Sequence, residues 1–200
     1  FNNRFKLKVI KRFYDQGSIL DYGAGDGQFA NFMIKKKWNV KIYEPLLKNM
    51  SDLSLNEDEI GSDSFDVITM FHSLEHIHNV EKTLQNLYNL LNKDGILIVS
   101  VPNHNAYERR FFKSKWIAYD APRHLYHFNH ETIKLFLNKN KFDVIITRSM
   151  YLDTLYNTLM SLNKDMFLFL KFIGISLISI FKTIWNKQYS SSILLVCKKR

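Results

Sequence analysis

A glycine-rich turn near the start of the chain limits the possible folds more than any other feature of this sequence. Residues 21–27 carry three glycines in a GxGxG spacing, between a short apolar run over 19–22 and a helical pattern over 27–37. Glycines let the backbone turn sharply and approach a ligand, and the start of the following helix offers N–H groups to a negative group. The segment therefore predicts a strand–turn–helix unit of an open α/β sheet, in which ligands bind at the carboxyl ends of strands.

The rest of the chain continues to alternate strands with helices. Strand patterns cover 40–43, 65–70, 96–101, 143–147 and 192–197, and helical patterns cover 3–14, 80–92 and 130–139. The strand over 96–101 is continuously apolar, which is typical of burial on both faces of a parallel sheet. Asn79 is placed to begin the helix over 80–92, and Gly95 to end it. The alternation predicts an α/β fold, a Rossmann-like, doubly wound, mostly parallel sheet with an antiparallel last strand, in one domain over 1–200.

Composition fits a single globular domain. Of the 200 residues, 46% are hydrophobic and 14% aromatic, which supplies a sizeable core and excludes a disordered chain. The lone Cys197 cannot form an internal disulfide, which fits a reducing, cytoplasmic compartment. The net charge of +9 can attract nucleic acid, anionic lipid or an acidic ligand. The basic residues are scattered and no RNA-binding module pattern occurs, so nucleic acid is the least favoured of these partners.

Two carboxylates indicate which ligand the glycine turn binds. Asp21 precedes the first glycine by two residues, and Glu44 ends the next strand, 17 residues after Gly27. A carboxylate at Asp21 opposes a pyrophosphate but suits a ligand with an ammonium and a sulfonium group, and Glu44 can bind a ribose diol. Gln28 replaces the last glycine of the dinucleotide fingerprint GxGxxG. An NAD-dependent oxidoreductase is therefore a disfavoured alternative.

Several short segments between residues 18 and 150 occur in a characteristic order. They are residues 19–27, Tyr43-Glu44-Pro45, residues 64–68, Leu74-Glu75-His76, residues 91–97, and Asp120-Ala121-Pro122-Arg123-His124-Leu125 followed by Phe128. In order and spacing they resemble the motifs of class I S-adenosylmethionine-dependent methyltransferases, and the last resembles a signature of the branch with ubiquinone-type O-methyltransferases. The resemblance implies S-adenosylmethionine as cofactor and S-adenosylhomocysteine as product.

The resemblance also assigns cofactor contacts. The matching positions are Asp21, Gly23, Ala24, Gly25, Glu44, Asp52, Phe71 and His72. Asp21 and the glycine backbone would hold the methionine end, and Glu44 the ribose hydroxyls. Phe71 and His72 would line the adenine or methionine side, and Asp52 would lie near the adenine. Asp52 falls in a stretch of 20 residues between two strands, shorter than the family usually has, so a helix and a strand are shortened there or residues are missing from the sequence.

Two histidines, His72 and His124, are the candidate catalytic residues. Histidine is a suitable base for an acceptor hydroxyl at neutral pH, whereas a nitrogen acceptor needs no base. Residues 72–76 match HxxEH, a metalloprotease arrangement, but they follow a strand directly, which disfavours a protease. We assign no metal ligand and expect His76 to hydrogen-bond the backbone; a divalent metal that assists transfer to a catechol-like hydroxyl is an alternative.

Two segments lie outside the regular alternation. Residues 103–128 interleave aromatic and basic side chains and predict a flap over a substrate pocket, with plain packing or nucleic-acid binding as alternatives. Residues 152–189 form an insertion in which residues 166–181 are almost continuously apolar. A helix of that length spans about 24 Å, short of the ~30 Å hydrocarbon core of a bilayer. The insertion is therefore expected to be a lid, a membrane-surface helix over 166–185, or a homodimer interface.

These features together predict an S-adenosylmethionine-dependent methyltransferase, located in the cytoplasm or at a membrane surface. The family resemblance implies that its acceptor is a small molecule or a lipid- or sugar-linked molecule and that the methyl group is transferred to oxygen. The alternative from another class is a non-catalytic nucleotide-binding domain that docks on a membrane or on nucleic acid.

Overall fold

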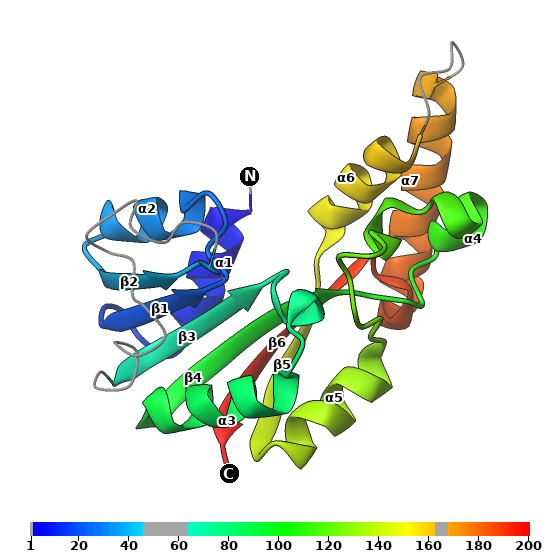
Figure 1. Ribbon diagram of the computed structural model, residues 1–200. Helices are drawn as coiled ribbons and strands as arrows, with labels where there is room; N and C mark the ends of the chain where they lie inside the picture. Colours follow the sequence, from blue (N-terminus) through cyan, green and yellow to red (C-terminus); the bar gives the residue numbers. More distant parts are fainter. Residues whose placement is uncertain (1, 46–63, 163–167) are drawn as a thin grey trace.

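The computed structural model describes residues 2–45, 64–162 and 168–200. In these ranges six strands form one sheet in the order β2-β1-β3-β4-β6-β5 (Figure 1). The parallel strands are β1 (Ser18–Tyr22), β2 (Asn39–Tyr43), β3 (Phe65–Phe71) and β4 (Leu91–Pro102). β6 (Ser192–Lys199) runs antiparallel between β4 and β5 (Phe142–Ser149). The predicted mostly parallel sheet with an antiparallel last strand is confirmed.

Helices cover both faces of the sheet. α1 (Asn3–Ile10) and α2 (Gln28–Ile34) lie on one face, and α3 (Val80–Leu90) and α5 (His130–Lys139) lie on the other (Figure 1). Successive side chains of a strand point to opposite faces. In β4, Ile96 accordingly packs in the cluster with α1 and α2, and Leu97 packs in the cluster with α3 and α5; both are fully buried. The continuously apolar strand is thus buried on both faces, as predicted.

The structure confirms the predicted start of α3 and corrects its predicted end. The Asn79 side chain caps the helix by accepting a hydrogen bond from the Lys82 N–H at 3.1 Å. The helix ends at Leu90, however, and β4 begins at the next residue, so Gly95 lies inside the strand. A Cβ on Gly95 would come within 3.1 Å of the Phe65 carbonyl oxygen, so close approach of the backbone explains this glycine better than helix termination does.

The two irregular segments lie together beyond one end of the sheet. The 103–128 connection contains the short helix α4 (Arg109–Phe112), and the insertion contains α6 (Tyr151–Ser161) and α7 (Leu168–Trp185). Figure 1 shows these three helices at the end of the sheet to which β3 and β4 point. Within the described ranges, no helix combines the length and apolar character that crossing a membrane requires.

The α6–α7 pair has its polar side chains inside and its apolar side chains outside. The buried residues are small and polar: Thr154, Asn157, Thr158, Ser161, Ser176, Ser179 and Thr183. The large apolar side chains of α7 are exposed, with 62% of Leu177, 61% of Phe181 and 84% of Trp185 accessible. Soluble monomers rarely expose large apolar patches, so this face is a candidate interaction surface.

Candidate active site

The first part of the candidate site is a cavity of about 270 Å³ at the carboxyl end of β1. Its lining residues include Lys6, Asp21, Gly23, Ala24 and Phe71. The Gly23 backbone has a φ of 77°, a left-handed conformation that glycine adopts freely. A Cβ at this position would lie 2.4 Å from the Ser73 Cβ, so the turn packs directly on the chain that leaves β3. Four predicted cofactor residues, Asp21, Gly23, Ala24 and Phe71, therefore share one cavity.

Two opposite charges lie in this cavity. Asp21 is 3% exposed and accepts a hydrogen bond from the Thr69 hydroxyl at 2.7 Å. Burial raises the pKa of Asp21 to about 6, although the Thr69 hydrogen bond and the Lys6 charge oppose the shift. The Lys6 Nζ lies 3.8 Å from the centroid of the Phe71 ring, and burial lowers the pKa of Lys6. A buried carboxylate beside a cation is complementary in charge to the ammonium and carboxylate groups of an α-amino acid.

The remaining predicted cofactor residues lie around the turn. Glu44 follows β2, and its Oε2 accepts a hydrogen bond from the Gly25 N–H at 2.9 Å. This contact holds the carboxylate at the glycine turn, next to the cavity. Asp52 lies outside the described residues. His72, predicted for the cofactor side as well as for catalysis, lines the neighbouring cavity.

That neighbouring cavity, of about 460 Å³, is the second part of the candidate site. It lies between the turn after β3, the 117–124 segment and α6, and its ionisable lining residues are His72, Glu75, Asp120, Arg123, His124 and Asp153. His72 directly follows Phe71, so two consecutive residues at the end of β3 line the two cavities. The His72 backbone has a φ of 54°, uncommon for a residue other than glycine, and such local strain concentrates at functional sites.

Carboxylates hold His72 from two sides. Its Nε2 lies 3.1 Å from Asp153 Oδ2, and its Nδ1 lies 3.5 Å from Glu75 Oε1. Burial lowers the pKa of His72, but the hydrogen bond with Asp153 and the negative charges of Asp153 and Glu75 outweigh it and raise the pKa to about 10. His72 is therefore a cation at neutral pH, and the Asp153 contact ties α6 to the end of β3.

His124 presents one ring nitrogen to the same cavity. Its Nδ1 lies 2.8 Å from the Ala118 carbonyl oxygen, and its Nε2 lies 4.0 Å from Glu75 Oε1 and 3.8 Å from Asp120 Oδ2. A carbonyl oxygen only accepts hydrogen bonds, so Nδ1 carries the proton and Nε2 is the basic nitrogen of the neutral ring. The structure thus brings His72 and His124 together around the buried Glu75.

His76 bonds the backbone, as expected. Its Nδ1 lies 3.0 Å from the Arg123 carbonyl oxygen. Leu74–His76 form a single 3₁₀ turn, labelled η3, rather than the long helix on which a metalloprotease HxxEH motif lies.

Sequence reasoning did not identify Lys6, Asp120 and Asp153 as charged members of the site. Lys6 comes from α1, Asp153 is 81 residues from its partner His72, and Asp120 lies beside His124. No local pattern marks Lys6 or Asp153, because only the sheet topology brings them to the end of β3. Asp120 belongs to the motif over 120–128, and that motif is the signal that could have indicated it.

The fold is a Rossmann-like α/β domain, and its two cavities meet at the end of β3. The family model described as "Methyltransferase domain" matches residues 2–147, and the chain belongs to that family. This match confirms the class I methyltransferase family that the sequence motifs resemble.

Individual relatives are distant. The ubiquinone biosynthesis O-methyltransferase of Rickettsia typhi is 29% identical over 115 residues, 48% of this chain and 47% of that protein, so the chain spans about half the length of this relative. A methyltransferase structure from Archaeoglobus fulgidus matches 98% of this chain and 92% of its own, with a TM-score of 0.64 and 17% identity. A second structure is the 1,6-didemethyltoxoflavin-N1-methyltransferase of Burkholderia thailandensis, solved with 1,6-didemethyltoxoflavin and S-adenosylhomocysteine. It matches 98% of this chain and 76% of its own, with a TM-score of 0.58 and 14% identity. At such identities the two structures support the fold alone.

Proposed function

We propose that this domain transfers the methyl group of S-adenosylmethionine to an oxygen atom of a small-molecule acceptor. The observation that supports this most directly is the position of Phe71 and His72. Consecutive residues at the end of β3 line a cavity with amino-acid-binding charges and a cavity with acid–base groups. The methyl donor and the acceptor would therefore meet at the end of β3.

The cofactor cavity fits the methionine end of S-adenosylmethionine. Asp21 would pair with its ammonium group, Lys6 with its carboxylate, and Glu44 with the ribose hydroxyls. The cofactor supplies a methyl group already activated on a sulfonium, so the protein mainly positions the two reactants. Such orientation can contribute on the order of 7–11 kcal/mol.

The acceptor cavity fits an oxygen nucleophile. The Nε2 of His124 is placed to take the proton of an acceptor hydroxyl, and the charged His72 is placed to bind its oxygen. Positioned bases typically contribute 10²–10⁴-fold to the rate. The Rickettsia relative is named an O-methyltransferase, which agrees with transfer to oxygen.

Calorimetric titration with S-adenosylmethionine, S-adenosylhomocysteine and NAD in parallel tests the cofactor. We expect micromolar binding of the first two, none of NAD, and loss of binding in Asp21→Ala. Binding of NAD in place of the adenosyl ligands would contradict the proposal. Adenosyl binding without methyl transfer to any hydroxyl or amine in an acceptor panel would favour a non-catalytic nucleotide-binding domain.

Replacement of His124 tests the acceptor side. His124→Gln should leave cofactor binding unchanged and lower transfer to a phenolic acceptor by about 10²-fold or more. His78→Gln is the matched control, because His78 is exposed and does not line either cavity. Unchanged transfer in His124→Gln, or transfer to amines alone, would contradict methylation at oxygen.

We further propose that the exposed apolar face of α6 and α7 binds an anionic membrane surface. Lys171, Lys182 and Lys187 lie exposed along and beside this face. The neighbouring Arg109, Arg110 and Lys113 line an open cavity of about 550 Å³. Lys182 Nζ lies 5.8 Å from the Tyr107 ring centroid, which places the basic end of α7 beside the residues that lead into α4. An apolar face bordered by cations matches the chemistry of an acidic bilayer surface.

The acceptor cavity opens on this face. Tyr156 and Met160 of α6 line the cavity and are 61% and 50% exposed. An acceptor with a lipid tail could therefore occupy the cavity with its reactive ring while its tail stays in the bilayer. This continuity supports a lipid-linked acceptor over a sugar.

Vesicle flotation tests the membrane proposal. Binding to phosphatidylglycerol vesicles should exceed binding to phosphatidylcholine vesicles and fall sharply in the double variant Phe181→Asp with Trp185→Ser. Leu135→Ser is the matched control, because Leu135 on α5 is 69% exposed outside this face. Undiminished flotation of the double variant would contradict the proposal. A dimer in sedimentation that the same double variant dissociates, without flotation of the wild type, would show that a second copy covers the face.

A further inference from the structure

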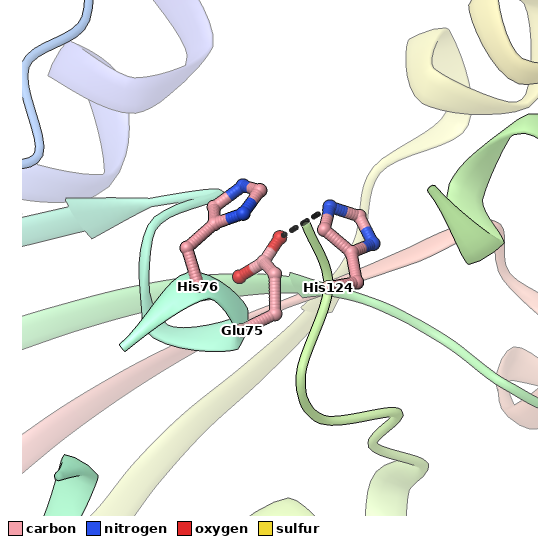
Figure 2. Close-up of side chains that lie close together, drawn as sticks. All are labelled: Glu75, His76 and His124. Atoms are coloured by element: carbon pink, nitrogen blue, oxygen red, sulfur yellow. Dashed lines mark ion pairs between the residues drawn. The ribbon is translucent and has the colours of Figure 1, made fainter. Parts of the chain in front are cut away.

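Three side chains with unused ligand atoms converge at the edge of the acceptor cavity. Glu75 and His76 come from the turn η3, and His124 comes from the 117–124 segment (Figure 2). One ligand atom from each lies within 4.8 Å of the other two, and the His76 and His124 ring centroids are 4.6 Å apart. Figure 2 shows the carboxylate directed between the two imidazole rings.

Backbone contacts fix both imidazoles in the same tautomer. The Nδ1 of His76 lies 3.0 Å from the Arg123 carbonyl oxygen, and the Nδ1 of His124 lies 2.8 Å from the Ala118 carbonyl oxygen. Each Nδ1 therefore donates its proton, and each Nε2 of a neutral ring has a lone pair. Metal-binding histidines almost always donate their second ring N–H in this way.

The carboxylate between them is buried and short of donors. Glu75 is fully buried, and within the described ranges neither of its oxygens has a hydrogen-bond partner. Its nearest charged neighbour is His72, at 3.5 Å from Oε1. Buried polar atoms are normally satisfied, and a buried charge is usually paired or coordinates a metal. The His72 ring, 3.5 Å from Oε1, offsets part of the Glu75 charge, and a bound cation would pair the carboxylate and both Nε2 lone pairs at once.

We propose that Glu75, His76 and His124 bind a divalent transition-metal ion of the zinc type. Two imidazole nitrogens and one carboxylate oxygen form a three-ligand set that leaves a fourth position open, as in catalytic zinc sites. Nitrogen donors favour zinc and its transition-metal neighbours over magnesium and calcium, which prefer oxygen ligands. Tetrahedral ligands at ~2.1 Å from zinc lie roughly 3.4 Å apart, so small side-chain rotations close the site.

The fourth position faces the cavity that Glu75 and His124 line. The metal's role there rests on the proposed methyl transfer to oxygen: an acceptor hydroxyl bound to the ion has a lowered pKa. Its proton leaves to water, an oxygen lone pair forms the new O–CH₃ bond, and the S–CH₃ electron pair stays on sulfur as S-adenosylhomocysteine forms. The Nε2 of His124 then serves as a metal ligand, and the ion takes over the activation of the hydroxyl.

Binding of Co²⁺ to the chelator-treated full chain tests the site without an activity assay. We expect one Co²⁺ per chain with the strong visible absorption of a tetrahedral site, displaced by Zn²⁺. His76→Gln and His124→Gln should each weaken Co²⁺ binding at least about tenfold and remove that absorption. His78→Gln is the matched control and should bind as the wild type does. Circular dichroism establishes that each variant is folded.

The outcomes separate the metal site from the methyl transfer. No Co²⁺ binding by the wild type, or wild-type binding by both histidine variants, would overturn the site. Titration with S-adenosylmethionine on the same samples should be unaffected by metal removal. Tetrahedral Co²⁺ binding without methyl transfer would support the site while the proposed function fails. Full transfer by the metal-free chain would overturn the metal's role and leave the proposed function in place.

Discussion

Asp21 has a buried carboxylate whose charge depends on pH near neutrality. Burial raises its pKa to about 6; Lys6 from α1 opposes the rise and Glu44 beside β2 adds to it. The charge is present above this pH and is lost as the pH falls through 6. Any ligand that needs the ionised form must therefore bind more weakly in acid.

The affinity for S-adenosylmethionine should reflect this titration. Between pH 7, where an α-amino group is still protonated, and pH 5, we expect about a tenfold loss, because binding falls about tenfold per pH unit below the pKa. Asp21→Asn keeps an acceptor for the Thr69 hydroxyl but should bind equally weakly at both pH values. Calorimetry at the two pH values measures this, and an equal affinity of the wild type at both would contradict it.

The glycine turn offers a matched pair of substitutions. Gly23 and Gly25 both have a left-handed backbone, with φ of 77° and 56°. A Cβ on Gly23 would come 2.4 Å from Ser73 Cβ, whereas one on Gly25 meets nothing within 4 Å. Gly25→Ala should therefore lower the free energy of unfolding by about 1–2 kcal/mol, for the backbone alone. Gly23→Ala should lower the free energy of unfolding by about 1–3 kcal/mol more than that, because its Cβ would overpack against Ser73. Urea denaturation of both variants measures the difference, and equal losses would contradict the argument.

At the scale of elements, the α6–α7 pair buries polar side chains and exposes apolar ones. An apolar substitution inside the pair should therefore destabilise it, and a polar substitution on its exposed face should not. Ser179 is fully buried, whereas Leu177, two residues away on α7, is 62% exposed. Ser179→Leu should lower the free energy of unfolding by about 1–3 kcal/mol through overpacking, although it adds an apolar side chain. Leu177→Ser should leave it unchanged within about 0.5 kcal/mol, as surface substitutions do. Thermal unfolding in detergent-free buffer distinguishes the two, and destabilisation by Leu177→Ser alone would show that the face is covered.

Most elements could be predicted from the sequence because the apolar residues in each follow a single spacing, that of a helix or that of a strand. The α5 helix matches its predicted range, and its cap Asn129 accepts hydrogen bonds from the N–H groups of Glu131 and Thr132. The helix over 3–14 was predicted too long, since α1 ends at Ile10 and turns follow. The apolar content of 166–181 predicted a helix but not its orientation, because burial of Ser176, Ser179 and Thr183 depends on what the helix packs against.

The cofactor side of the site could be predicted where its residues lie at the ends of the parallel strands. Asp21, Gly23 and Phe71 could be grouped because they lie at or just beyond the ends of strands, and the carboxyl ends of parallel strands share one edge of the sheet. The orphaned carboxylate of Glu75 could not be foreseen, since its lack of donors is a property of the folded surroundings. The same holds for Lys6 and Asp153, which reach the site from helices far apart in the chain.

At the scale of the whole molecule, charge and apolar area should contribute separately to membrane binding. The net charge is +9, and screening shortens the reach of charges from about 10 Å at 0.1 M salt to about 3 Å at 1 M. Binding to phosphatidylglycerol vesicles should therefore weaken at least about tenfold over this range. Phe181→Ser should lower the affinity at both salt concentrations and keep the same ratio between them. Flotation measures both, and salt-independent binding of the wild type would contradict the role of the basic residues.

The opening of the acceptor cavity on the exposed side of α6 has a kinetic consequence. A lipid-tailed acceptor that reaches Tyr156 and Met160 from the bilayer never crosses bulk water. The enzyme would then respond to the mole fraction of acceptor in the membrane, rather than to its amount per volume of solution. Diluting the acceptor with inert lipid at constant total acceptor would slow turnover, and concentrating the whole suspension would not restore it.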